Sequence, residues 1–127
     1  MTLIKKWFLQ FGLLIATALF HSFVFAAWPD KPVKIIVPFA PGGATDLVGR
    51  ALALKLSGVW NQQVLVENKP GAGGNIAARF VAKEAADGYT FLVTTSTTQA
   101  ANVHLYRKLP YDPVKDFTPI GKIGETG

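Results

Sequence analysis

The stretch VPFAPGGATDLVGRAL, from Val37 to Leu52, passes directly from an apolar segment through Pro41-Gly42-Gly43 into an amphipathic one. The apolar segment begins at Val33, and its lack of polar alternation is typical of a strand that is buried on both faces of a sheet. Downstream, Thr45 to Gly58 predicts a helix that stops at the glycine. A strand, a glycine turn and a helix in this order form the first part of a β-α-β unit.

The predicted helix has an apolar face and a polar face. Arg50 and Lys55 mark the side that is expected to meet water. The side that is expected to pack against the sheet carries apolar residues at helical spacing, namely Leu47, Val48, Ala51, Leu52 and Leu54.

The same alternation continues along the chain. Gln63 to Glu67 predicts a second strand, Asn75 to Ala86 a second helix and Tyr89 to Thr94 a third strand. This order predicts an α/β fold, with a parallel sheet, right-handed crossovers and helices on its faces. The pattern further downstream indicates a helical turn, a proline-rich surface connection and the start of another strand, at residues 102–106, 109–119 and 117–123.

The first 26 residues have the three-part composition of a secretory signal peptide. Lys5 and Lys6 precede a nearly uncharged run from Trp7 to Phe25, and the small residues Ala26 and Ala27 follow it. Cleavage after Ala26 is expected, which would give an exported, soluble mature chain. An uncleaved membrane anchor is the alternative, because the apolar run approaches the roughly 20 residues that cross a bilayer.

Composition excludes several classes of protein. The 127 residues carry a formal net charge of +5, but the basic side chains are scattered, so a nucleic-acid interface is not expected. The chain has no cysteine, which fits an oxidising compartment and excludes a lipid-modified N-terminal cysteine.

Two glycine-rich loops follow the first and second predicted strands, at residues 41–43 and 70–74, and each precedes a helix. Ligands of open α/β sheets collect at the carboxyl ends of the strands. A helix N-terminus there offers unpaired backbone N–H groups and a partial positive charge, and glycine lets an anion approach them. The alternative is that the glycines only permit turns, while Thr45 and Asn75 cap their helices.

Two further features belong to the same edge of the predicted sheet. Asp46 suits the dipole at the start of its helix, but its charge would repel a bound anion unless it points away or meets a cationic part of the ligand. The third strand leads into a hydroxyl-rich loop, residues 94–99, whose side chains can donate hydrogen bonds without adding charge. A solvated loop that caps the next turn is the alternative interpretation.

Motifs of catalysis are missing from the sequence. Neither glycine loop matches the phosphate-binding or the dinucleotide-binding pattern, so no nucleotide cofactor is expected. Ser96 lacks the flanking glycines of a nucleophile elbow, and His104 has no evident carboxylate partner. No cluster of residues with metal-ligand spacing is present, so neither a metal nor an enzymatic activity is expected.

Five ordered motifs resemble the Bug family, the extracytoplasmic solute receptors of tripartite tricarboxylate transporters. They are WPDKPV from Trp28, IVPFAPGGATD from Ile36, VENKPGAGGN from Val66, DGYT from Asp87 and LPYDPVKDFTPI from Leu109. The resemblance implies a type II periplasmic binding protein-like fold of two α/β domains in the periplasm. These domains would close on a small organic carboxylate or acidic amino acid and deliver it to the membrane permease subunits of the transporter.

Members of this family are much longer chains. Beside the signal peptide expected at 1–26, the resemblance therefore implies a truncated N-terminal ligand-binding domain at 27–127, with the second domain absent. It implies ligand binding in the first two loops, and the hydroxyl loop adds side-chain donors; the residues are Gly42, Gly43, Ala44, Thr45, Asp46, Gly73, Gly74, Asn75, Ser96, Thr97 and Thr98. The third loop departs from the family pattern, which leaves the identity of the ligand open. Two alternatives are a fragment of an exported carboxylate-processing enzyme and a truncated receptor without function.

Overall fold

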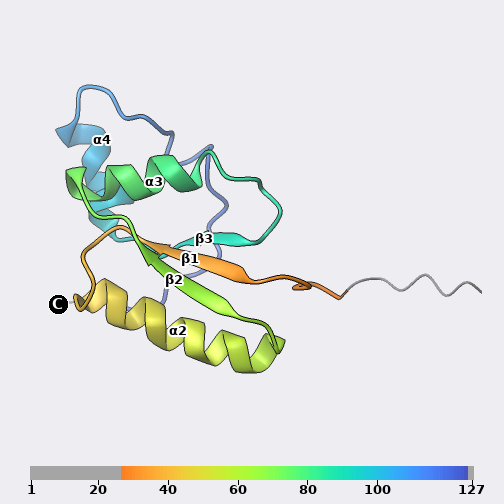
Figure 1. Cartoon of the computed structure of the whole chain (residues 1–127). Helices are drawn as coiled ribbons and strands as arrows, with labels where there is room; N and C mark the ends of the chain where they lie inside the picture. Colours follow the sequence, from red (N-terminus) through yellow and green to blue (C-terminus); the bar gives the residue numbers. More distant parts are fainter. Residues whose placement is uncertain (1–26, 126–127) are drawn as a thin grey trace, which may run out of the picture.

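The computed structural model describes residues 27–125, which fold into a three-stranded parallel sheet with helices on both faces (Figure 1). The strands are β1 (Val33–Val37), β2 (Val64–Asn68) and β3 (Thr90–Leu92), in the order β2-β1-β3. The register places Ile35 of the central strand beside Val66 and Phe91. The predicted strand, helix, strand, helix, strand alternation is confirmed. The predicted signal peptide lies outside the described residues.

The two longer helices lie on opposite faces of the sheet (Figure 1). Helix α2 (Ala44–Trp60) contacts β1 and β2, and α3 (Asn75–Val81) contacts β1 and β3. Helix α2 ends at Trp60, and the next residue, Asn61, adopts the left-handed conformation, so the prediction of a stop at Gly58 was wrong. Helix α3 is shorter than predicted, because Lys83 and Glu84 bond to the carbonyls three residues earlier and tighten the chain into turns.

The face of α2 that meets the sheet is not the predicted one. Its buried residues are Asp46, Gly49 and Ala53, whereas Leu47 and Leu54 are 60% and 75% exposed. The reason is close packing: a Cβ on Gly49 would lie 3.0 Å from Val37 Cγ2, so small residues bring the helix backbone close to β1.

The core lies on both sides of β1. On the α2 side, the buried residues Ile35, Val37, Ala53 and Val93 form a cluster. Partly buried apolar side chains surround this cluster, namely Leu52, Val64, Val66 and Phe91. Of the predicted apolar stripe on α2, Leu52 therefore does pack against the core.

The end of the sheet opposite the glycine loops is closed by aromatic side chains. The rings of Trp28 and Trp60 lie 4.9 Å apart, edge to face, and Trp60 stacks near Phe91 at 6.5 Å. These contacts join the N-terminal segment of the described chain to the end of α2 and to β3.

After β3 the chain forms a π-helical turn (Thr97–Ala101), helix α4 (Asn102–Leu105) and an irregular segment. This confirms the predicted helical turn and surface connection. The strand predicted at 117–123 is wrong: the described part of the chain forms none there, and Ile120 is 78% exposed. Within residues 27–125, no helix is both long and apolar enough to cross a membrane.

Candidate functional site

Three loops meet at the carboxyl edge of the sheet, because the three strands are parallel. Side chains link them directly. Asn68 Nδ2 at the end of β2 donates to the carbonyl of Phe39 after β1 at 3.0 Å. Thr98 Oγ1 in the third loop donates to the carbonyl of Gly73 in the second loop at 3.0 Å. The sequence-predicted site residues therefore belong to one edge of the molecule.

The first loop leaves backbone donors free at the start of α2. The first helical bond runs from Leu47 N–H to Gly43 O at 3.0 Å. The N–H groups of Ala44, Thr45 and Asp46 therefore precede the first intrahelical bond, and none has a hydrogen-bond partner among residues 27–125. Gly43 occupies the N-cap position with φ −77° and no side-chain cap, so Thr45 does not cap the helix as the alternative interpretation expected.

The two glycines of this loop serve different purposes. Gly42 has φ +85°, a conformation that favours glycine, so it makes the turn possible. Gly43 has an ordinary backbone conformation, and a Cβ there would meet nothing closer than Ala40 O at 3.6 Å. The described structure therefore does not itself require glycine at position 43.

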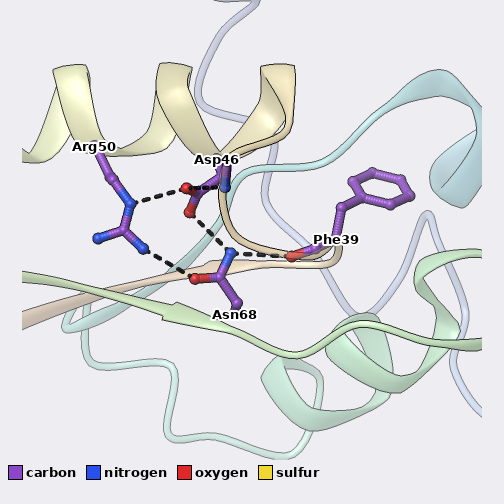
Figure 2. Close-up of polar contacts among 5 residues, drawn as sticks. Phe39, Asp46, Arg50 and Asn68 are labelled. Carbon is purple, nitrogen blue, oxygen red and sulfur yellow. Dashed lines mark hydrogen bonds and ion pairs between the residues drawn. The ribbon is translucent and has the colours of Figure 1, made fainter.

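Asp46 is 1% exposed and lies at the centre of a polar network (Figure 2). Its Oδ2 accepts from Gly42 N–H at 2.8 Å and from Arg50 Nε at 2.9 Å, and its Oδ1 accepts from Asn68 Nδ2 at 2.8 Å. A second guanidinium nitrogen of Arg50 donates to Asn68 Oδ1 at 3.1 Å. The network joins the first loop, α2 and the end of β2.

These contacts stabilise the ionised form of the Asp46 carboxyl. The hydrogen bond from Arg50, followed by those from Gly42 N–H and Asn68, holds its pKa well below the usual range, despite the opposing effect of burial. Asp46 is therefore a carboxylate whose two oxygens are already engaged by protein donors.

The second loop uses its own backbone donors internally. Gly74 N–H bonds to Gly71 O at 3.0 Å, and Asn75 N–H bonds to Ala72 O. Gly73 and Gly74 have φ of +62° and +90°, and a Cβ on Gly74 would collide with Thr98 Oγ1. This loop is therefore packed tightly against the third loop.

The side chain of Asn75 is buried and does not cap α3. Its Oδ1 accepts from Asn102 Nδ2 at 2.6 Å and lies 2.9 Å from the Tyr111 hydroxyl. The Tyr111 hydroxyl also lies 2.6 Å from the carbonyl of Thr98. Asn75 and Thr98 are thus part of an internal network that ties the second and third loops to the segment around Tyr111.

The remaining polar groups of the third loop fall into two sets. Ser96 and Thr97 are exposed. The side-chain oxygens of Thr94, Thr95 and Gln99 are buried and have no hydrogen-bond partner among the described residues. Because a buried polar atom without a partner costs free energy, this loop has unused hydrogen-bonding capacity beside the first two loops.

Sequence reasoning missed four residues that build the edge: Arg50, Asn68, Asn102 and Tyr111. Arg50 carries a local signal, since it lies four residues after Asp46 on the same helix. The other three contact partners that are distant in sequence, so no local pattern identifies them. Residues 27–125 contain no cluster of acidic, histidine or cysteine side chains suited to a metal ion.

Comparison with known proteins gives a consistent result. The family described as "Tripartite tricarboxylate transporter family receptor" matches residues 48–126. Protein BugT of Bordetella pertussis is 41% identical over 116 residues, which cover 90% of this chain and 36% of BugT.

Solved structures agree with the sequence match. An R. palustris protein "with adipate" has a TM-score of 0.71 and 47% identity, and MatC from Rhodopseudomonas palustris "with bound malate" has a TM-score of 0.69 and 44% identity. Each match covers 72% of this chain and 31% of the other chain. The neighbours are periplasmic binding proteins, which confirms the predicted fold class. The chain spans about a third of the length of these relatives.

Proposed function

Because this chain belongs to the tripartite tricarboxylate transporter receptor family, we propose that it binds a small organic carboxylate at the amino end of α2. The observation that carries the proposal is the set of free N–H groups at Ala44, Thr45 and Asp46. They lie at the carboxyl edge of the sheet, where a helix dipole favours an anion. Adipate and malate, which the two similar structures contain, are the first ligands to test.

In this proposal the site residues have different roles. Ala44, Thr45 and Asp46 hold the carboxylate through their backbone N–H groups, Gly43 leaves room for it beside them, and Ser96 and Thr97 add side-chain hydrogen bonds. The loops that surround the carboxylate are shaped by the Asp46 side chain and by five other predicted residues: Gly42, Gly73, Gly74, Asn75 and Thr98. The side chains of Asp46, Asn75 and Thr98 already form hydrogen bonds within the protein, which supports a structural role for them rather than contact with the ligand.

We further propose that residues 27–127 are part of the first domain of a longer two-domain receptor. The matched region makes up only about a third of each relative, so a second domain would supply the rest of the site and close over the ligand. The protein would bind its ligand without chemical turnover, need neither cofactor nor metal, and pass the ligand to membrane permease subunits.

The proposed location is the periplasm, reached through a signal peptide that is cleaved after Ala26. Mass spectrometry of the exported protein tests this directly, because a cleaved chain begins at Ala27. Recovery of an intact N-terminus in the membrane fraction would favour the anchor instead.

Isothermal titration calorimetry of the full-length protein with adipate, malate and acidic amino acids tests the binding function. Ala44→Pro is the informative variant, because proline is favoured at the first helical position and removes only one free N–H. Gly43 has ψ of 167°, the extended conformation that a residue before proline prefers. We expect Ala44→Pro to lower the affinity for every carboxylate about tenfold, because the variant loses one charge-assisted hydrogen bond to the ligand.

Ala44→Ser is the matched control, because it changes the side chain and keeps the N–H. Equal affinities of Ala44→Pro and the wild type would exclude this helix end as the anion site. If mass spectrometry shows that the wild-type protein converts a carboxylate into a product, the alternative of an exported carboxylate-processing enzyme would be supported instead.

A further inference from the structure

A negative charge lies in the first turn of the helix that is proposed to receive an anion. The Asp46 carboxylate is built into this turn, because its Oδ2 accepts from Gly42 N–H and so fixes the glycine turn. An uncompensated carboxylate there would repel a bound carboxylate. The site therefore needs a group that neutralises Asp46 without occupying the free N–H groups.

Arg50 has the required geometry. Its Nε lies 2.9 Å from Asp46 Oδ2, and another guanidinium nitrogen lies 3.1 Å from Asn68 Oδ1 (Figure 2). These two contacts hold the guanidinium in one orientation, one helical turn after Asp46 on α2. The Arg50 side chain is 51% exposed, so its charge remains partly solvated while it pairs with a buried carboxylate.

Asn68 completes the arrangement from the neighbouring strand. Its Nδ2 donates to Asp46 Oδ1 at 2.8 Å and to Phe39 O at 3.0 Å. Both carboxylate oxygens of Asp46 are thereby engaged by donors other than the N–H groups of the first helical turn.

We propose that Arg50 is a positioning and charge-balancing residue of the carboxylate site. It neutralises Asp46 and keeps that carboxylate turned toward Gly42 and Asn68, so the same helix end can contain one carboxylate and bind another. This inference rests on the proposed carboxylate-binding function. It assigns to Arg50 an effect on ligand affinity that does not require contact with the ligand.

The test compares Arg50→Gln, Arg50→Lys and Lys55→Gln in the full-length protein, by calorimetry with malate and adipate. Lys55→Gln is the matched control: it removes the same charge from an exposed position on α2, and no ion pair of Lys55 occurs among residues 27–125. In about 20 mM salt we expect Arg50→Gln to weaken binding about fivefold, while Arg50→Lys and Lys55→Gln stay within about twofold of the wild type. In about 0.5 M salt the Arg50→Gln deficit should shrink, because salt screens the repulsion that reaches the ligand through solvent, but part of the deficit should remain because Asp46 itself is buried.

A double variant separates charge balance from structural support. If Arg50 acts by neutralising Asp46, then Asp46→Asn combined with Arg50→Gln should bind carboxylates more tightly than Arg50→Gln alone. A purely structural role predicts further loss in the double variant and a deficit that does not depend on salt. Either of those results overturns the proposal, as does unchanged affinity of Arg50→Gln at low salt.

The failure of this inference can be told apart from the failure of the proposed function. If the wild-type protein binds no carboxylate, both are wrong. If the wild type binds malate or adipate and Arg50→Gln matches it at both salt concentrations, only the role of Arg50 is wrong.

Discussion

The Nδ2 atom of Asn102 lies 2.6 Å from Oδ1 of Asn75, although 27 positions separate the two residues. The same nitrogen lies 3.0 Å from the carbonyl of Gly73. One buried amide thus joins α4 to both the second glycine loop and the first residue of α3. The loops at the carboxyl edge are therefore held by a specific polar network, and four predictions follow from its geometry and from that of the first loop.

Asn102→Ala should lower the free energy of unfolding by about 1–3 kcal/mol, because it removes two hydrogen bonds to buried acceptors on Asn75 and Gly73, which keep only the Tyr111 and Thr98 hydroxyls. Urea denaturation followed by circular dichroism measures the change. His104→Ala is the control: this residue is exposed on the same helix, and its loss should cost less than about 0.5 kcal/mol. Equal stabilities of the two variants would contradict a stabilising role for the network.

Gly74→Ala should cost more than about 2 kcal/mol, because it combines a left-handed backbone with a collision against Thr98 Oγ1. Adding Thr98→Ala removes the colliding atom. The double variant should therefore be more stable than the sum of the two single changes predicts. Simple additivity of the unfolding free energies would show that the collision is relieved in another way.

Gly43→Ala should lower the affinity for carboxylates without changing the stability of the fold. Its backbone conformation is ordinary and its Cβ would have room, so the unfolding free energy should change by less than about 0.5 kcal/mol. The added methyl group would nevertheless stand beside the free N–H groups of α2, and we expect carboxylate affinity to fall about tenfold.

Gly42→Ala provides the contrast, because φ of +85° makes it cost about 1 kcal/mol of stability. Thermal denaturation and calorimetry on the same samples give both quantities. Unchanged affinity in Gly43→Ala would place the ligand away from this residue.

Asp46→Asn should show a pH-dependent loss of stability. The pKa of Asp46 is lowered in the folded state, so ionisation of this group stabilises the fold above its unfolded pKa of about 3.9. As pH falls from the unfolded pKa toward the folded pKa, the wild type loses the stabilisation that ionised Asp46 provides. Asp46→Asn has no carboxylate at this position, so its stability has no such dependence on pH. The stability difference between the two proteins should therefore be full at pH 7 and shrink below about pH 4.

Urea denaturation at pH 7, 4 and 3 measures this difference. Asp87 and Asp112 also have lowered pKa values, through backbone hydrogen bonds from Tyr89 and from Lys115, but they are present in both proteins and cancel in the comparison. A difference that stays constant over this range would show that Asp46 contributes through packing rather than through its charge.

Much of the fold could be predicted from local sequence. The apolar run from Val33 and the glycine loops marked strands and turns, because strand burial and turn conformation depend on neighbouring residues. The face of α2 could not be predicted in this way. Large apolar residues such as Leu47 and Leu54 suggested the packed side, but the close approach at Gly49 selects small residues instead.

Local sequence patterns were enough to predict the alternation of strands and helices, the parallel sheet and the edge at which the glycine loops gather. They also identified the free helix end at Ala44 and Thr45, because unpaired N–H groups are an intrinsic property of a helix start. Which polar side chains remain free depends instead on contacts between segments that are distant in the chain. The side chains of Asp46 and Asn75 are engaged by Asn68, Asn102 and Tyr111, and Thr98 Oγ1 donates to the carbonyl of Gly73. These partners lie 22 to 36 positions away in the chain. Such pairings depend on how the strands place their ends side by side, and no local spacing encodes them.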